Sequence, residues 1–175
     1  MLCRTETLFT SCSMYNMNEI TIEKLKSDNA KIIVDWCKDR DEDFLRQWAG
    51  AGYSYPLTAE QICGRLAEGA QIFEAHRGGE MVGTIEIIEI DEQNNSALVG
   101  RFVLDQTVTG KGIGAEVMTA FLQYCKEKLG LSQVTLFVFD FNIGAHKCYQ
   151  KCGFCEIGRV ERPNGWIAIN MKKTL

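Results

Sequence analysis

The spacing of apolar residues divides the chain into segments of two kinds. Polar and apolar residues alternate over Glu19–Glu23, which predicts a β-strand. The same period of two returns after Ala70, where Arg77-Gly78-Gly79 separates two runs and predicts a hairpin. The later segments predicted as strands are 71–76, 80–90, 97–104, 134–139, 154–160 and 165–171.

Apolar residues also recur every three or four positions, which is the period of a helix. The longest such stripe runs from Gly112 to Gly130 and consists of Ile113, Val117, Met118, Phe121, Leu122, Cys125 and Leu129. Shorter stripes predict helices at 32–37, 44–48, 58–66 and 142–151. Ser27-Asp28-Asn29 offers N-caps for the first of these, and Thr58 with Gln61 fits a capping box for the third. The pattern predicts an α/β chain of the α+β type, with an antiparallel middle and one parallel strand–helix–strand unit.

Composition places the chain among ordinary globular proteins. Its 175 residues fit one domain, and 46% hydrophobic with 24% charged residues is typical of a soluble protein. We expect residues 1–17 to be a flexible extension and 18–175 to be the single domain. The first residues lack the pattern of a signal peptide. No apolar run approaches a membrane span, and a net charge of −4 without a basic stripe makes nucleic acid an unexpected partner.

The eight cysteines are expected to be reduced thiols in a cytoplasmic protein. Cys152 and Cys155 form the one C-x-x-C pair, and a four-cysteine zinc site would require a second pair nearby. We therefore predict no metal site.

Three glycines at alternate positions, Gly110, Gly112 and Gly114, separate a predicted strand from the long helix. Such a loop places unhindered N–H groups at the positive end of a helix, where they can bind a pyrophosphate. A P-loop would require Gly-x-x-x-x-Gly-Lys-Ser/Thr, which is absent from the sequence. A dinucleotide loop would place the third glycine one residue later and closer to the strand, although Asp140 could then bind a ribose. The alternative to a phosphate-binding loop is a glycine-rich turn that binds no ligand.

A second motif follows the next strand. Asn142, Ala145 and Tyr149 share one face of a predicted helix, and Gly153-Phe154 comes directly after it. The order strand, glycine loop, helix, strand, Asn-x-x-Ala-x-x-x-Tyr, Gly-Phe resembles the GNAT superfamily of acetyl-CoA-dependent N-acetyltransferases. The resemblance implies a mixed, mostly antiparallel central sheet of about six or seven strands flanked by helices.

The resemblance also implies a site for acetyl-CoA. In the family the fourth strand ends in a bulge and splays from the fifth, the pantetheine arm enters the gap, and the glycine loop binds the pyrophosphate. The matching residues here are Val103, Leu104, Thr109, Gly110, Lys111, Gly112, Ile113, Gly114 and Asn142. Thr109 stands where the family usually has Arg or Gln, so we expect weaker binding of the cofactor. The matching tyrosine of the family protonates the departing thiolate, which assigns this role to Tyr149.

The general base and the acceptor site have fewer signals. Many relatives carry a glutamate on the fourth or fifth strand, where this chain has Leu98 and Phe137. Glu86 is the candidate for the base, and Glu89 has the opposite parity, so at most one of them can face the cleft. The segment from Trp48 to Tyr55, with Asp41, Glu42 and Asp43 nearby, is a candidate for acceptor recognition, and Arg101 and Trp166 are candidates for lining the cleft.

We therefore expect an N-acetyltransferase that moves the acetyl group of acetyl-CoA to a primary amine of a small molecule by direct attack in a ternary complex. An amino acid derivative, a polyamine or an aminoglycoside fits this expectation. A peptide N-terminus or a protein lysine is the alternative acceptor, and a non-catalytic acetyl-CoA-binding module is the alternative function. A homodimer is common among relatives of this family.

Overall fold

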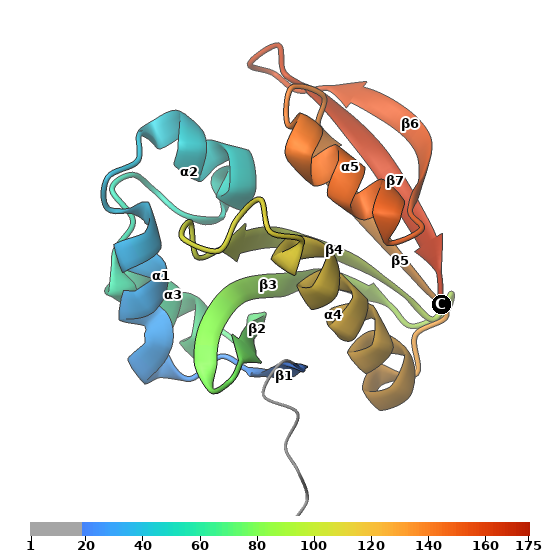
Figure 1. Ribbon diagram of the computed structural model, residues 1–175. Coiled ribbons are helices and arrows are strands. Elements are labelled where there is room, and N and C mark those ends of the chain that lie inside the picture. Colours follow the sequence, from blue (N-terminus) through green and yellow to red (C-terminus); the bar gives the residue numbers. More distant parts are fainter. Residues whose placement is uncertain (1–18) are drawn as a thin grey trace, which may run out of the picture.

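Seven strands form one mixed sheet in the computed structural model, which describes residues 19–175 (Figure 1). The sheet has the order β1-β2-β3-β4-β5-β7-β6, and every neighbouring pair is antiparallel except β4 and β5. The strands are β1 (Ile20–Lys24), β2 (Gln71–Arg77), β3 (Glu80–Asp91), β4 (Ser96–Leu104), β5 (Gln133–Phe139), β6 (Cys155–Glu161) and β7 (Ile167–Thr174). The predicted fold class and the single parallel unit are confirmed. The expected extension over residues 1–17 lies outside the described residues.

Helices cover both faces of this sheet. They are α1 (Ala30–Cys37), α2 (Glu42–Ala49), α3 (Ala59–Ala67), α4 (Ile113–Leu129) and α5 (Ile143–Lys151), with single 3₁₀ turns at Ser27–Asn29 and Gly50–Gly52. Neighbouring strand residues point to opposite faces, so Ile72 packs with α1–α3 while Phe73 packs with α4 and α5. Within residues 19–175, no helix combines the length and the apolar character that a membrane span requires.

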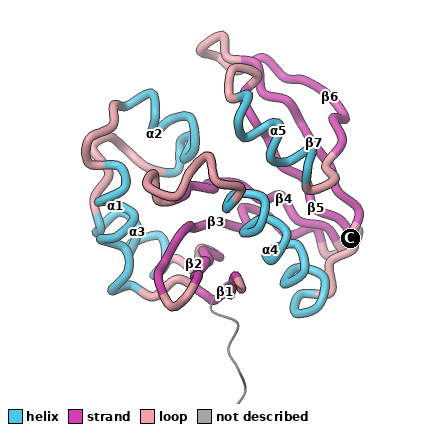
Figure 2. The backbone as a smooth tube through the Cα atoms, viewed as in Figure 1, coloured by secondary structure: helices cyan, strands magenta, loops and turns pink. Residues whose placement is uncertain are grey.

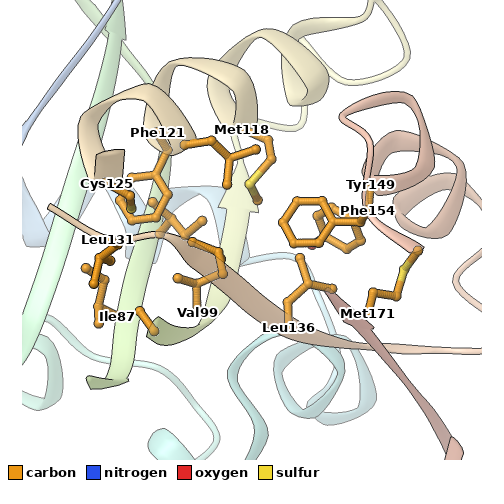
Figure 3. Packing of buried hydrophobic residues seen from close by; sticks show 14 of the residues in the cluster. Ile87, Val99, Met118, Phe121, Cys125, Leu131, Leu136, Tyr149, Phe154 and Met171 are labelled. Atoms are coloured by element: carbon orange, nitrogen blue, oxygen red, sulfur yellow. The ribbon is translucent and has the colours of Figure 1, made fainter. Parts of the chain in front are cut away.

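The core beneath α4 follows the predicted stripe (Figure 3). Met118, Phe121 and Cys125 are fully buried and pack on strand residues such as Val99 and Leu136. Leu129 is the exception, because it lies in the last turn of α4 and is 37% exposed. The prediction that Leu129 faces the core was therefore wrong.

Of two predicted helix caps, Thr58 caps its helix and Asn29 does not. Thr58 caps α3 by accepting a hydrogen bond from the backbone N–H of Gln61. The reciprocal bond of a capping box is replaced, because the Gln61 amide donates instead to the carbonyls of Ser54 and Pro56. Asn29 precedes α1 but makes no capping bond, since its side chain donates to the buried Glu74 at 2.8 Å. Gln61 therefore binds the segment just before its helix, whereas Asn29 binds a residue 45 positions further along the chain.

Candidate active site

The parallel pair β4–β5 separates part of the way along its length. The strands pair from Ser96↔Gln133 to Val99↔Leu136 and then diverge. Beyond Val99, β4 keeps β3 on one side and has no strand on the other within residues 19–175. A cleft of about 550 Å³ lies in this gap, bounded by both strands, α2, α5 and the loop before α4. The expected splay is present, and it leaves the backbone edge of β4 open toward the cleft.

A β-bulge in β4 accompanies the splay. Gly100 pairs with Glu86 and Val103 with Thr84, so Arg101 and Phe102 together face the single residue Ile85. Arg101 has a φ of +47°, a left-handed conformation that is uncommon for a residue with a side chain. The bulge turns Arg101 toward α2, where its Nε donates to the carbonyl of Ala49 at 3.1 Å.

The glycine loop connects β4 to α4 along one side of the cleft (Figure 2). Gly110 and Gly112 have φ values of +77° and +86°, which glycine adopts without steric cost. Gly112 is the N-cap of α4, and its carbonyl accepts hydrogen bonds from the N–H groups of Ala115 and Glu116, which leaves the N–H groups of Ile113 and Gly114 without intrahelical partners beside the cleft. A Cβ on Gly114 would lie 3.3 Å from both Cys148 Sγ and a methyl carbon of Leu104, which explains the third glycine.

The polar side chains of this loop bond to carbonyl groups of the loop itself. Lys111 Nζ donates to the carbonyl of Thr107 at 3.1 Å, and the Thr109 hydroxyl donates to the carbonyl of Gln106 at 2.9 Å. Ile113 is buried in the core. Thr109, Gly110, Gly112 and Gly114 line the cleft, as do Val103, Leu104, Asn142 and Tyr149. Any anion here would therefore meet mainly backbone N–H groups.

Helix α5 forms the opposite wall. Asn142 caps it, as predicted, by accepting a hydrogen bond from the N–H of Ala145 at 3.2 Å. Tyr149 lines the cleft but is buried, and its ring packs against Phe102 and Phe154 at centroid distances of 6.4 and 5.9 Å. Burial raises the pKa of the Tyr149 phenol, which keeps the hydroxyl protonated at neutral pH.

Cys148 of α5 and Cys152, the C-cap of the same helix, lie near Tyr149. Cys148 lines the cleft, and a hydrogen bond with it lowers the pKa of Cys152 to about 7, with Thr119 adding to the effect. All six cysteines in the described part of the chain are free thiols. That part also contains no cluster of three or more side chains suited to a metal ion.

Glu86 lies beside the cleft but does not line it. It is 3% exposed, and its Oε1 accepts hydrogen bonds from Arg65 and, at 2.9 Å, from Arg101. Its Oε2 is buried and has no hydrogen-bond partner within residues 19–175. Glu89 is exposed and does not line the cleft either, and a bulge between Ile87 and Glu89 interrupts the alternation from which their opposite parity was predicted.

The remaining candidates divide between the cleft and its surroundings. Trp48 and Arg101 line it, whereas Trp166 packs against Phe139 at 4.9 Å behind it. Phe44 and Gln47 were missed, although Phe44, Gln47 and Trp48 share one face of α2 at helical spacing. That spacing is the signal that could have identified them.

The comparisons with known proteins agree with this geometry. The model of the acetyltransferase (GNAT) family matches residues 33–154. Over 77 residues the chain is 31% identical to spermine/spermidine N(1)-acetyltransferase of Bacillus subtilis strain 168, a match that covers 44% of this chain and 51% of that protein. The chain therefore spans about half the length of the curated relatives it matches.

Solved structures extend the likeness over nearly the whole chain. Spermidine N-acetyltransferase from Vibrio cholerae in complex with CoA and spermine has a TM-score of 0.75 at 19% identity, covering 89% of this chain and 95% of that one. Aminoglycoside acetyltransferase AAC(6')-Ib in complex with coenzyme A has a TM-score of 0.70 at 21% identity, covering 89% and 95%. At these identities the likeness shows the fold alone. Together with the family match, it establishes that the chain belongs to the acetyltransferase (GNAT) family.

Proposed function

We propose that the protein is an N-acetyltransferase that moves the acetyl group of acetyl-CoA to a primary amine of a small molecule. The observation that carries the proposal is the splayed gap between β4 and β5, with the glycine loop and the start of α4 at its side. The proposed reaction is a direct attack of the amine on the thioester while both substrates are bound.

The residues around the gap suit acetyl-CoA as a co-substrate. The free N–H groups at the start of α4 favour a pyrophosphate. Lys147 and Lys151 of α5 line the cleft and add positive charge, and no Asp or Glu is among the described residues that line it. The open edge of β4 at Val103 and Leu104 can pair with the amides of the pantetheine arm as an added strand would.

We assign the acid to Tyr149. Its raised pKa leaves the phenol protonated, so it can give a proton to the thiolate that departs when the tetrahedral intermediate collapses. The ring is fixed by its contacts with Phe102 and Phe154, which positions the hydroxyl. The backbone N–H groups at the bulge can stabilise the oxyanion.

We retain Glu86 as the candidate for the general base. Its Oε2 is free to accept a proton, and Gly100, which pairs with Glu86, lines the cleft. Replacing Glu86 by glutamine is expected to lower kcat by about 10²-fold, because the amide cannot accept the proton of the amine. It should also cost about 3 kcal/mol of stability, because Arg65 and Arg101 lose their shared carboxylate.

The exposed Glu89 gives the matched control, since Glu89→Gln should change neither kcat nor the free energy of unfolding. Initial rates give kcat, and urea unfolding gives the free energy of unfolding. A Glu86→Gln variant that keeps kcat and raises only the KM for the amine would contradict the base and assign Glu86 to holding Arg101.

Localisation and assembly belong to the same proposal. We place the protein in the cytoplasm, where the free thiols of the described residues stay reduced. A homodimer stays a prediction.

The decisive experiment is mass spectrometry of the purified protein with acetyl-CoA and a panel of amino acids, polyamines, aminoglycosides and short peptides. We expect a small amine that is heavier by one acetyl group and absent without protein. Acetylated peptides alone would favour the peptide or lysine alternative. Bound acetyl-CoA without product from any acceptor would favour a non-catalytic binding module, and neither binding nor product would refute the proposal.

A further inference from the structure

One wall of the cleft differs in chemistry from the glycine loop. This wall consists of Phe44, Gln47 and Trp48 of α2 together with Phe137 of β5 and Arg101 of β4. Arg101 is the charged residue among them, whereas the other cations in the described cleft lining, Lys147 and Lys151, belong to α5. The pocket offered to an acceptor is therefore aromatic and carries a cation.

Arg101 is held in place before any ligand arrives. Its Nε donates to the carbonyl of Ala49 and its Nη1 to Glu86, and the guanidinium packs against Gly52 so closely that a Cβ there would lie 2.1 Å from Nε. Its Nη2 has no hydrogen-bond partner within residues 19–175. A guanidinium with its orientation fixed and its Nη2 group without a partner can donate a charge-assisted hydrogen bond to a carboxylate.

The charge around Arg101 is not cancelled. Arg65 and Arg101 share one oxygen of one carboxylate, so the group of Arg65, Arg101 and Glu86 carries a net positive charge. The Arg101 side chain is 16% exposed, and in such a half-buried position a net charge is felt more strongly than at the open surface.

The nearby acidic residues do not offset this charge. Asp41 accepts the N–H of Phe44 as the N-cap of α2, and Glu42 and Asp43 both pair with Arg46. None of these carboxylates lines the cleft. A polycation would meet aromatic rings and a guanidinium there, with no carboxylate of the described cleft lining to neutralise it.

We propose that the acceptor is a primary amine that also carries a carboxylate and an apolar side chain, as an α-amino acid does, and that Arg101 binds this carboxylate. The inference rests on the proposed function and narrows its substrate class. Phe44, Trp48 and Phe137 then contact the apolar side chain, and the amine is directed toward the thioester between β4 and β5.

The test compares matched acceptors at saturating acetyl-CoA, with the acetylated product quantified by mass spectrometry. The acceptors are phenylalanine, phenylalaninamide and spermidine. We expect kcat/KM for phenylalanine to exceed that for its amide by about 10- to 100-fold, the range of hydrogen bonds to a charged group. The amine of phenylalaninamide is less basic than that of phenylalanine, so a larger fraction of it is unprotonated and able to attack at neutral pH. A preference for phenylalanine therefore cannot arise from the amine itself.

Two variants separate recognition from general damage. Arg101→Met should bring the ratio of acid to amide close to one, mainly through the KM for phenylalanine. Lys147→Met removes a cleft cation on α5 and should raise the KM for acetyl-CoA while the ratio stays as in the wild type. The comparison within the wild type requires no variant, so it stands even if Arg101→Met fails to fold.

The outcomes are distinguishable from those of the proposed function. Acetylation of the amide or of spermidine at least as efficient as that of phenylalanine would overturn the carboxylate inference and leave the acetyltransferase standing. If the ratio of kcat/KM for phenylalanine to that for its amide were unchanged in Arg101→Met, Arg101 would not be the residue that recognises the carboxylate. Absence of product from every amine would overturn the proposed function and this inference with it.

Discussion

Replacing Tyr149 by phenylalanine is expected to lower kcat by about 10²- to 10⁴-fold while the Kd for acetyl-CoA stays unchanged. The substitution keeps the ring that packs against Phe102 and Phe154 and removes only the hydroxyl. Because burial raises its pKa, the phenol should stay protonated well above neutral pH, so it should add no alkaline limb to the profile of the wild type below that raised value. Initial rates against pH and calorimetric titration of acetyl-CoA measure both effects.

Tyr124 provides the matched control. It is a second tyrosine of the core, with its ring 5.3 Å from that of Phe73, and it does not line the cleft. Tyr124→Phe should therefore keep the wild-type kcat. A Tyr149→Phe variant with unchanged kcat would refute the acid assignment. A rise in Kd without a fall in kcat would show that the hydroxyl binds the cofactor.

The second large effect is expected at the glycine loop, where Gly112→Ala should weaken acetyl-CoA binding by about tenfold or more. The φ of Gly112 is +86°, and a residue with a Cβ strains this conformation by about 1–2 kcal/mol. Because Gly112 is the N-cap, relief of this strain should displace the N–H groups at the start of α4 that we assign to the pyrophosphate. Calorimetric titration of acetyl-CoA gives the Kd, and urea unfolding gives the cost in stability.

Gly69 separates local binding from general strain. Its φ is +90°, and a Cβ on Gly69, like one on Gly112, would meet no atom within 4 Å, but Gly69 lies between α3 and β2 and outside the cleft lining. Gly69→Ala should therefore lose a similar free energy of unfolding and keep the wild-type Kd. Equal changes in Kd for both variants would contradict the assignment of the loop to phosphate binding.

The parts of the fold that the sequence predicted well depend on neighbours along the chain. The stripe of α4 from Ile113 to Cys125 is buried as expected, since a helical period fixes one face. The prediction for Leu129 was wrong, because this residue of the last turn is exposed and lies outside the core cluster. The last strand begins at Ile167 instead of near Gly165, because the Asn164 side chain accepts the N–H of Trp166 and prolongs the turn.

The parts of the site that were not predicted depend on residues far apart in sequence. Arg65 and Arg101 meet at Glu86 from a helix and a bulged strand, and no local pattern pairs residues that are 21 and 15 positions away. In the same way Asn29 binds Glu74, 45 residues further on, instead of capping the helix beside it. The glycine loop and Tyr149, which we propose for the cofactor, each belong to a short motif. Of the residues we propose for the acceptor, Trp48 and Arg101 were candidates from the sequence, whereas Phe44 and Gln47 join them only through tertiary packing.

The short pairing of β4 with β5 has a mechanical consequence. Four residue pairs join the half of the sheet that contains β1–β4 to the half that contains β5–β7, whereas β5 and β7 are joined by seven. Beyond these four pairs, the two halves are held together by side chains, because the core cluster beneath α4 contains residues of both. A ligand that pairs with the open edge of β4 and contacts α5 would bridge the halves at the point where the strands do not, and its binding should raise the free energy of unfolding.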